Sequence, residues 1–208
     1  MRYQKWFFGA VLVLGVLAAT LFSALASTFT TIDIPGTAVT QAFGINNRGQ
    51  IVGRYIPAGG RFLRGYVLDH GTFTTIDVPG VTFTDTTEAI GINDRGQIVG
   101  AYTTGGEFGG HFHGYVLDHG TFTTIDVPGA TDTAAVGINN RGQIVGDYFA
   151  GTPINGTRRG FVLDHGTFTT IDAPGAGSAG TVLSGINDRG DIVGNVGLGS
   201  AGQGFILN

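Results

Sequence analysis

The chain has 208 residues, enough for one domain with its own hydrophobic core, and 42% of them are hydrophobic, which excludes a disordered chain. It has no cysteine, which excludes disulfide frameworks, thiolate metal sites and cysteine nucleophiles. Its 38 glycines follow no three-residue period, which excludes collagen, and its net charge of −4 argues against nucleic acids and anionic membranes as partners.

The first 26 residues have the features of a secretory signal peptide. Arg2 and Lys5 precede an apolar run, Trp6–Phe22, and Ala24–Ala26 form a small-residue cleavage site. We therefore predict a signal peptide over residues 1–26 and one mature domain over residues 27–208, secreted to the extracellular space or the periplasm. An uncleaved anchor is the alternative, because the run approaches membrane-spanning length.

Three sequence blocks recur along the mature chain and define a repeat. Thr28–Asp33 recurs at starts 44, 49 and 46 residues apart, a spacing typical of propellers and solenoids. A second block reads Gly-Ile-Asn-(Asn/Asp)-Arg-Gly-(Gln/Asp)-Ile-Val-Gly and begins at Gly44, Gly91, Gly137 and Gly185. A third begins at Gly65, Gly114, Gly160 and Gly204.

Each repeat predicts four short strands and no helix. In one copy they are Tyr66–Asp69, Thr72–Asp77, a strand near Ala89–Asn93, and Gln97–Tyr102. β-Branched and aromatic residues dominate them, and Gly, Pro, Asn and Asp separate them. Adjacent apolar residues within a strand indicate that both faces of each small sheet are covered.

Two kinds of connection alternate between these strands. Asn46–Gly49 fits a type I turn closed by a left-handed glycine, with the Asn46 side chain capping the turn, and Asp69–Gly71 fits a similar tight hairpin. The connections after Val78–Gly80 and after the Ile-Val-Gly strand are longer. In a meander the tight turns and the long loops fall on opposite faces, so sequence variation gathers on the long-loop face.

The termini predict how the array of strands closes. The chain begins with the second strand of a repeat and ends with the first, Gly204–Asn208, so the two ends together complete a fourth unit. We therefore predict an all-β fold with four repeats of a four-stranded antiparallel meander, a four-bladed β-propeller closed by its N- and C-terminal strands. An open solenoid and a larger ring built from two chains are the alternatives.

These blocks resemble the extracellular repeats of the HAF family, named for a His-Ala-Phe motif, over essentially all of the mature chain. The most specific part is the Gly-Ile-Asn block, whereas the name-giving motif is degenerate, as in His113-Gly114-Tyr115. The resemblance implies an extracellular β-repeat protein. Since the family has no well-defined activity, it transfers no site residues.

Candidate ligand-binding residues lie at the edge of the varied face. Tyr55, Tyr102 and Tyr148 follow the same strand in three copies, where they either stack on sugar rings or pack between blades. Arg54 and Arg158 are suited to bidentate recognition of carboxylates or sulfates, or else to pairing with nearby acids.

Metal and acid–base chemistry have weaker candidates. His111 and His113, with Glu107, have the residue types of a metal site. Asp residues before each Pro-Gly loop form a recurring set that either caps turns or binds Ca²⁺ as a ring of carboxylates: Asp33, Asp77, Asp126 and Asp172. Asp85, Glu88 and Asp132 are the acids available for glycan hydrolysis.

The sequence therefore predicts a secreted, non-catalytic propeller module without an obligatory cofactor, which binds a glycan or a surface protein through its long-loop face. A glycan-active hydrolase or lyase and a structural matrix or surface protein are the alternatives. We assign no catalytic residue from the sequence, since catalysis needs one site and repetition distributes a residue over all copies.

Overall fold

The computed structural model describes residues 28–82, 85–106, 110–151, 156–197 and 202–208, and everything below concerns these residues. The predicted signal peptide lies outside them, and Ile32–Asn208 form one compact unit. Within the described residues, no helix has the length and apolar character needed to cross a membrane.

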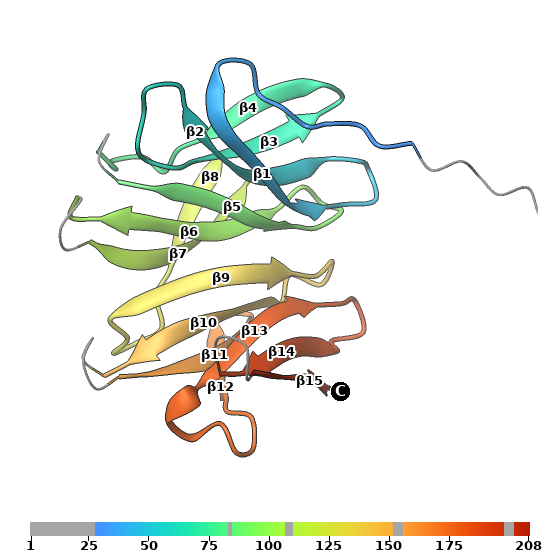
Figure 1. Cartoon of the computed structure of the whole chain (residues 1–208). Helices are drawn as coiled ribbons and strands as arrows, with labels where there is room; N and C mark the ends of the chain where they lie inside the picture. The colour runs from blue at the N-terminus through green and yellow to red at the C-terminus, as the bar shows by residue number, and fades with distance from the viewer. Residues whose placement is uncertain (1–27, 83–84, 107–109, 152–155, 198–201) are drawn as a thin grey trace, which may run out of the picture. The chain divides into compact units, whose positions relative to one another are not determined.

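The body is built from fifteen strands in four antiparallel sheets, as predicted (Figure 1). The first sheet runs in the order β1 (Thr37–Ile45), β2 (Ile51–Pro57), β3 (Arg64–Asp69) and β4 (Thr72–Ile76). The second has the same order: β5 (Thr87–Ile92), β6 (Ile98–Thr104), β7 (His111–Asp118) and β8 (Thr121–Ile125).

The third sheet contains β9 (Asp132–Ile138), β10 (Ile144–Ala150), β11 (Thr157–Asp164) and β12 (Thr167–Ile171). After a 3-10 turn, η1 (Gly177–Ala179), the fourth contains β13 (Thr181–Ile186), β14 (Ile192–Val196) and β15 (Gln203–Leu207). Every sheet is a simple meander, in which neighbours in sequence are neighbours in space.

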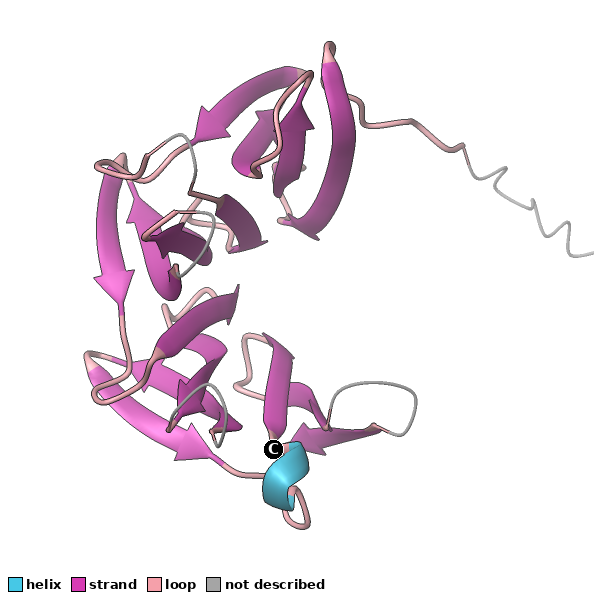
Figure 2. Ribbon diagram, turned by 60° about the vertical axis from the view of Figure 1, so that its left-hand side comes forward, coloured by secondary structure: helices cyan, strands magenta, loops and turns pink. Residues whose placement is uncertain are grey.

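The sheets follow one another around a common centre, the arrangement of a four-bladed β-propeller (Figure 2). The first strands of successive sheets are in contact, β1 with β5, β5 with β9, and β9 with β13. β13 and β1 are not among the strand pairs in extensive contact in the part of the chain that the structure describes.

Two details differ from the predicted architecture. The boundary between the first and second sheets lies at the Val78–Gly80 loop, and not before the Tyr66–Asp69 strand, where the predicted unit began. Each sheet therefore starts with the strand that contains Gly-Ile-Asn, and its third and fourth strands follow later in the sequence. The fourth sheet contains three strands, and Thr28–Asp33 have no strand assignment, so the predicted closure by N- and C-terminal strands is not formed here.

The tight turns have the predicted chemistry. The Asn46 carbonyl accepts a hydrogen bond from the Gly49 amide at 3.0 Å, and Gly49 has a φ of 77°. The Asn46 side-chain oxygen accepts from the amides of Arg48 and Gln50. At the other hairpin both His70 and Gly71 have positive φ, and the His70 ring bonds Asp69, which confirms a structural role for this recurring histidine.

Apolar side chains between consecutive sheets form the core. Val52, Val99 and Val145 occupy one position in the first three sheets, are fully buried, and pack against the next sheet. Both faces of the middle sheets are therefore covered, as the adjacent apolar residues predicted. This stacking holds the strand ends of two blades side by side, where a site can form.

Candidate functional site

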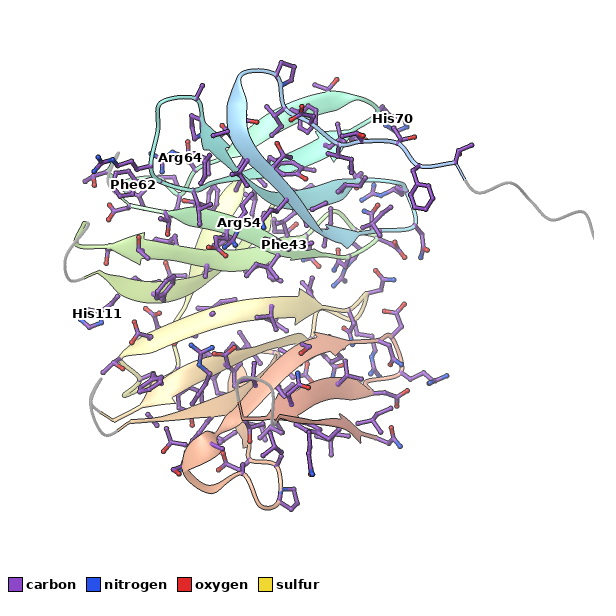
Figure 3. All side chains as sticks on the ribbon, in the orientation of Figure 1. Phe43, Arg54, Phe62, Arg64, His70 and His111 are labelled. Carbon is purple, nitrogen blue, oxygen red and sulfur yellow. The ribbon has the colours of Figure 1, made fainter. Side chains whose placement is uncertain are left out.

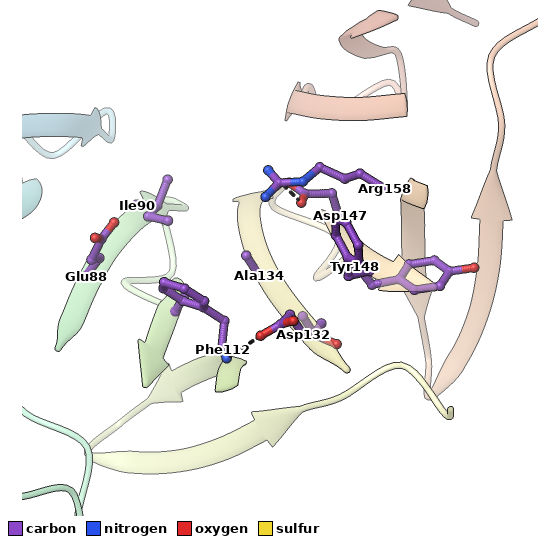
Figure 4. A pocket seen from close by; sticks show the side chains of 11 residues that line it. Glu88, Ile90, Phe112, Asp132, Ala134, Asp147, Tyr148 and Arg158 are labelled. Atoms are coloured by element: carbon purple, nitrogen blue, oxygen red, sulfur yellow. Dashed lines mark hydrogen bonds and ion pairs between the residues drawn. The ribbon is translucent and has the colours of Figure 1, made fainter. Parts of the chain in front are cut away.

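A pocket of about 260 Å³ lies between the second and third sheets (Figure 4). Its lining comes from β5, β6 and β7 on one side and from β9, β10 and β11 on the other. Asp132 and Arg158 lie at strand starts that follow long loops, so the pocket is near the long-loop face. The volume is below the range of roughly 300–1,000 Å³ typical of drug-sized ligands, which suits a small group.

The pocket exists because two alanines replace an ion pair. At the interface of the first two sheets, Arg54 on β2 reaches Glu88 on β5 at 2.6 Å. The strand pairings show that Ala101 on β6 corresponds to Arg54, and Ala134 on β9 to Glu88. The same location between the second and third sheets therefore has two methyl groups in place of two long side chains, and both alanines line the pocket.

Aromatic side chains form much of its wall. Phe112 is 44% exposed, and its ring projects into the space between β5 and β9 (Figure 4). Tyr148 is buried, lines the opposite side, and its hydroxyl lies 2.9 Å from the Thr170 hydroxyl. The pocket therefore has an exposed aromatic ring on one side and a packed one on the other.

Asp147 and Arg158 place opposite charges at one end of the pocket. Arg158 Nη1 lies 3.3 Å from Asp147 Oδ2, and the arginine side chain is four times as exposed as the carboxylate, 39% against 9%. Burial raises the pKa of Asp147 to about 6, because desolvation outweighs the attraction of Arg158. The pair thus offers an accessible guanidinium and a carboxylate that changes charge near pH 6.

Two further carboxylates complete the polar lining. Asp132 accepts a hydrogen bond from the Phe112 amide at 2.9 Å, which ties β9 to β7 and fixes the position of Phe112. Glu88 remains paired with Arg54 on the far side. Together with Asp147 and Arg158, these groups supply acceptors and donors around an apolar floor.

The structure brings only some of the predicted ligand-binding residues together. Tyr148 and Arg158 line the pocket. Tyr55 and Tyr102 bond threonines of the outermost strands of their own sheets, Thr75 and Thr124, which matches the packing alternative. Arg54 serves the ion pair with Glu88 and also donates to Gln41.

The two predicted histidine ligands each have a carboxylate neighbour. His113 bonds Asp126 and packs against Tyr102, His111 lies 3.7 Å from Asp132, and Glu107 is outside the described residues. Three of the four recurring aspartates follow the outermost strand of a sheet and pair with a basic side chain of that sheet: Asp77 with Arg64, Asp126 with His113, and Asp172 with Arg159. No group of three or more metal-ligating side chains comes together among the described residues.

The acids predicted for hydrolysis separate into two environments. Glu88 and Asp132 line the pocket, whereas Asp85 is buried elsewhere. Hydrogen bonds from the Thr82 amide and hydroxyl and from the Gly106 amide lower the pKa of Asp85 and give it a structural role in a loop.

Sequence reasoning missed Phe112, and it considered the acids near the arginines, among them Asp147, only as their partners. The signal was in the alignment of the repeats: position 101 is Ala where the previous copy has Arg54 and the next has Asp147. A small residue at an interface position that is charged in its neighbours marks an unfilled space.

Comparisons with known proteins give a likeness to solved structures alone. No family model matches the chain, and no curated protein matches it. Among solved structures, the chain is similar to the Aleuria aurantia lectin, a fungal lectin described as a six-bladed β-propeller with a novel mode of fucose recognition, at 19% identity and a TM-score of 0.47. The match covers 81% of this chain and 56% of the lectin.

Proposed function

We propose that the chain is a secreted, non-catalytic propeller module that binds one sugar residue of a glycan in the pocket between the second and third sheets. The observation that carries this proposal is the convergence of an exposed aromatic ring, an accessible guanidinium and carboxylates on a cavity of about 260 Å³.

The chemistry of a pyranose fits this arrangement. A sugar ring has an apolar face of C–H groups, which stacks on an aromatic ring such as Phe112. Its hydroxyls both donate and accept, so they pair with the Asp132 and Asp147 carboxylates and with the Arg158 guanidinium. The half-buried Arg54–Glu88 ion pair occupies the same space at the neighbouring interface, so we expect one such site per chain rather than one per repeat.

The proposal is tested by a titration with paired variants. A glycan that the mature protein, residues 27–208, retains in a polysaccharide and glycan screen is titrated calorimetrically against Arg158→Ala and Phe112→Ala. We expect each to lower affinity by roughly tenfold or more, equivalent to about 1.4 kcal/mol. Arg159→Ala is the matched control, since Arg159 pairs with Asp172 away from the pocket. Equal losses for Arg158 and Arg159 contradict the assignment.

A glycan hydrolase is the second candidate, favoured by one observation. Asp147 is a carboxylic acid with a pKa raised to about 6 in a pocket that also holds Glu88 and Asp132, which is the condition of a general acid beside carboxylates. Release of reducing ends from the retained glycan, abolished by Asp147→Asn with folding intact, would establish this alternative. Retention without turnover supports the binding module.

A further inference from the structure

The faces of the fourth and first sheets that no neighbouring sheet covers are open and apolar. Val193 on β14 is 47% exposed and Ile206 on β15 is 62% exposed, although their counterparts in the other sheets are buried or half-buried. The counterparts of Val193 are Val52, Val99 and Val145, all at 0%. Exposed contiguous apolar surface of this kind marks an interaction site.

The first sheet presents the matching half. Ile45 on β1 is 67% exposed and Ala42 is exposed, whereas Ala89 and Ala135, the counterparts of Ala42, are fully buried against the preceding sheet. Phe43, the residue after Ala42, lies instead beside Arg54, whose guanidinium is 5.2 Å from the ring centre (Figure 3).

The repeat itself identifies what covers such faces. At the first two formed interfaces the valine of one sheet packs on the alanine side of the next, Val52 with Ala89 and Val99 with Ala135, and at the third Val145 packs on Leu183 at the same position. The open valine face of the fourth sheet and the open alanine face of the first are therefore the two halves of one interface. Each lacks the other within the single chain, since β13 and β1 are not in extensive contact among the described residues.

A ladder of hydrogen bonds between tight turns supports the same pairing. The side-chain amide of Asn46 donates to the Asn93 carbonyl at 3.0 Å, Asn93 to Asn139 at 3.1 Å, and Asn139 to Asn187 at 3.1 Å. Asn187 ends the series, and its side-chain amide donates to Asp191 of its own turn. One donor of the ladder thus stands at the open face of the fourth sheet, and the Asn46 carbonyl stands at the open face of the first.

The residue after each of these asparagines alternates between Asn and Asp from one sheet to the next, and a fifth sheet stacked on the fourth would continue the alternation with Asn. The series Asn47, Asp94, Asn140 and Asp188 places each carboxylate beside carboxamides: Asp94 accepts from the amides of Asn47 and Asn140, which lowers the pKa of Asp94. Asp188 accepts from Asn140 alone in the described residues. If Asn47 of another first sheet lay beside Asp188, Asp188 would accept from two asparagines as Asp94 does, and no two carboxylates would be neighbours.

We infer that a second copy of this chain docks head to tail, with its first sheet on the fourth sheet of its neighbour. Val193 and Ile206 pack on Ala42 and Ile45 of the neighbour, and Asn187 donates to its Asn46 carbonyl. A contact between two different faces is heterologous, so it yields a closed ring or an open chain of copies rather than a dimer with twofold symmetry. This inference is independent of the proposed function, because the pocket lies between the second and third sheets.

The first test is the mass in solution of the mature protein, residues 27–208, by sedimentation equilibrium over a range of concentrations. We expect the weight-average mass to rise with concentration, and Val193→Glu and Ile206→Glu to remain monomeric with unchanged thermal unfolding in dilute solution. Leu207→Glu is the control, because Leu207 neighbours Ile206 on the opposite face of β15. A monomeric wild type, or association unaffected by both glutamates, overturns the inference.

A cross-link identifies the occupant. The chain has no cysteine, so Asn47→Cys with Asp188→Cys introduces the only two thiols. Oxidation is expected to link separate chains into dimers and higher species at concentrations where the wild type associates. A disulfide confined to monomers would show that the fourth sheet closes on the first sheet of its own chain, and no disulfide would show that the faces stay apart; either result overturns the inference.

Discussion

Two valines at the same repeat position provide a quantitative test of which blade interfaces are formed. Val99 is fully buried between the second and third sheets, and Val193 is 47% exposed on the fourth. Truncation of Val99 to alanine removes two buried methyl groups at about 0.8 kcal/mol each and leaves a cavity, for a total of roughly 2–3 kcal/mol. At Val193 about half of that transfer free energy applies and no closed cavity forms, so we expect roughly 1 kcal/mol or less.

The assay is urea unfolding of Val99→Ala and Val193→Ala at a concentration low enough for the wild type to be monomeric. Both substitutions delete the same atoms from the same type of strand, so differences in β-propensity cancel between them. Unchanged m-values would show that the free energies of unfolding are comparable.

The result that would refute this reasoning is an equal loss of stability in the two variants. It would mean that Val193 is covered in the monomer, as it would be if the fourth sheet packed on the first within the chain. A loss at Val193 that grows with protein concentration would instead agree with a second copy covering it.

Three further predictions concern charge, turns and a close backbone approach. The ionised Asp147 carboxylate destabilises the folded state; this cost is absent below the ordinary pKa of 3.8 and fully present above about 6. The Asp147→Asn variant should therefore gain stability relative to wild type as pH rises from about 4 to 7, by up to about 3 kcal/mol in urea unfolding. A difference that stays constant with pH would contradict the raised pKa. Asn93→Ala removes a turn cap and an inter-sheet donor and should cost roughly 1–3 kcal/mol more than Asn187→Ala, whose donor stays within its own turn; equal costs would remove the ladder's energetic role. A Cβ at Gly100 would lie 1.9 Å from the Glu88 carbonyl oxygen, so Gly100→Ala should lower the melting temperature by more than about 5 °C, and a neutral result would show that β5 and β6 separate easily there.

Local signals in the sequence were sufficient for the blades but not for their closure. The Asn46–Gly49 and Asp69–Gly71 turns have specific backbone requirements, so residue types alone predicted both hairpins, and the meander followed from them. The predicted repeat unit began two strands away from the true start of a sheet. A long loop within a sheet and a long loop between two sheets look alike in sequence, so the sequence did not show which loop separates the sheets. Packing between sheets decides this, and it involves residues about 45 positions apart.

The candidate site was predictable only in part for a related reason. Tyr148 and Arg158 were identified by type and position, yet Tyr55 and Tyr102, the equivalents of Tyr148, make the same kind of hydrogen bond to a threonine and do not line the pocket. What distinguishes the pocket is the absence of bulk at Ala101 and Ala134, on two strands of different sheets. A cavity is a property of both partners, and neither repeat alone indicates it.

The most direct test of the proposed site fills it without touching its polar groups. The double variant Ala101→Arg with Ala134→Glu reproduces the ion pair that Arg54 and Glu88 form at the preceding interface, in a geometry the fold already accepts. Wild type and variant, both residues 27–208, are compared on one glycan array, with melting temperatures as the control for folding. The account predicts saturable retention of at least one glycan by the wild type and its loss in the equally stable variant. Retention of the same glycans by both proteins, or by neither, would contradict a sugar site between the second and third sheets.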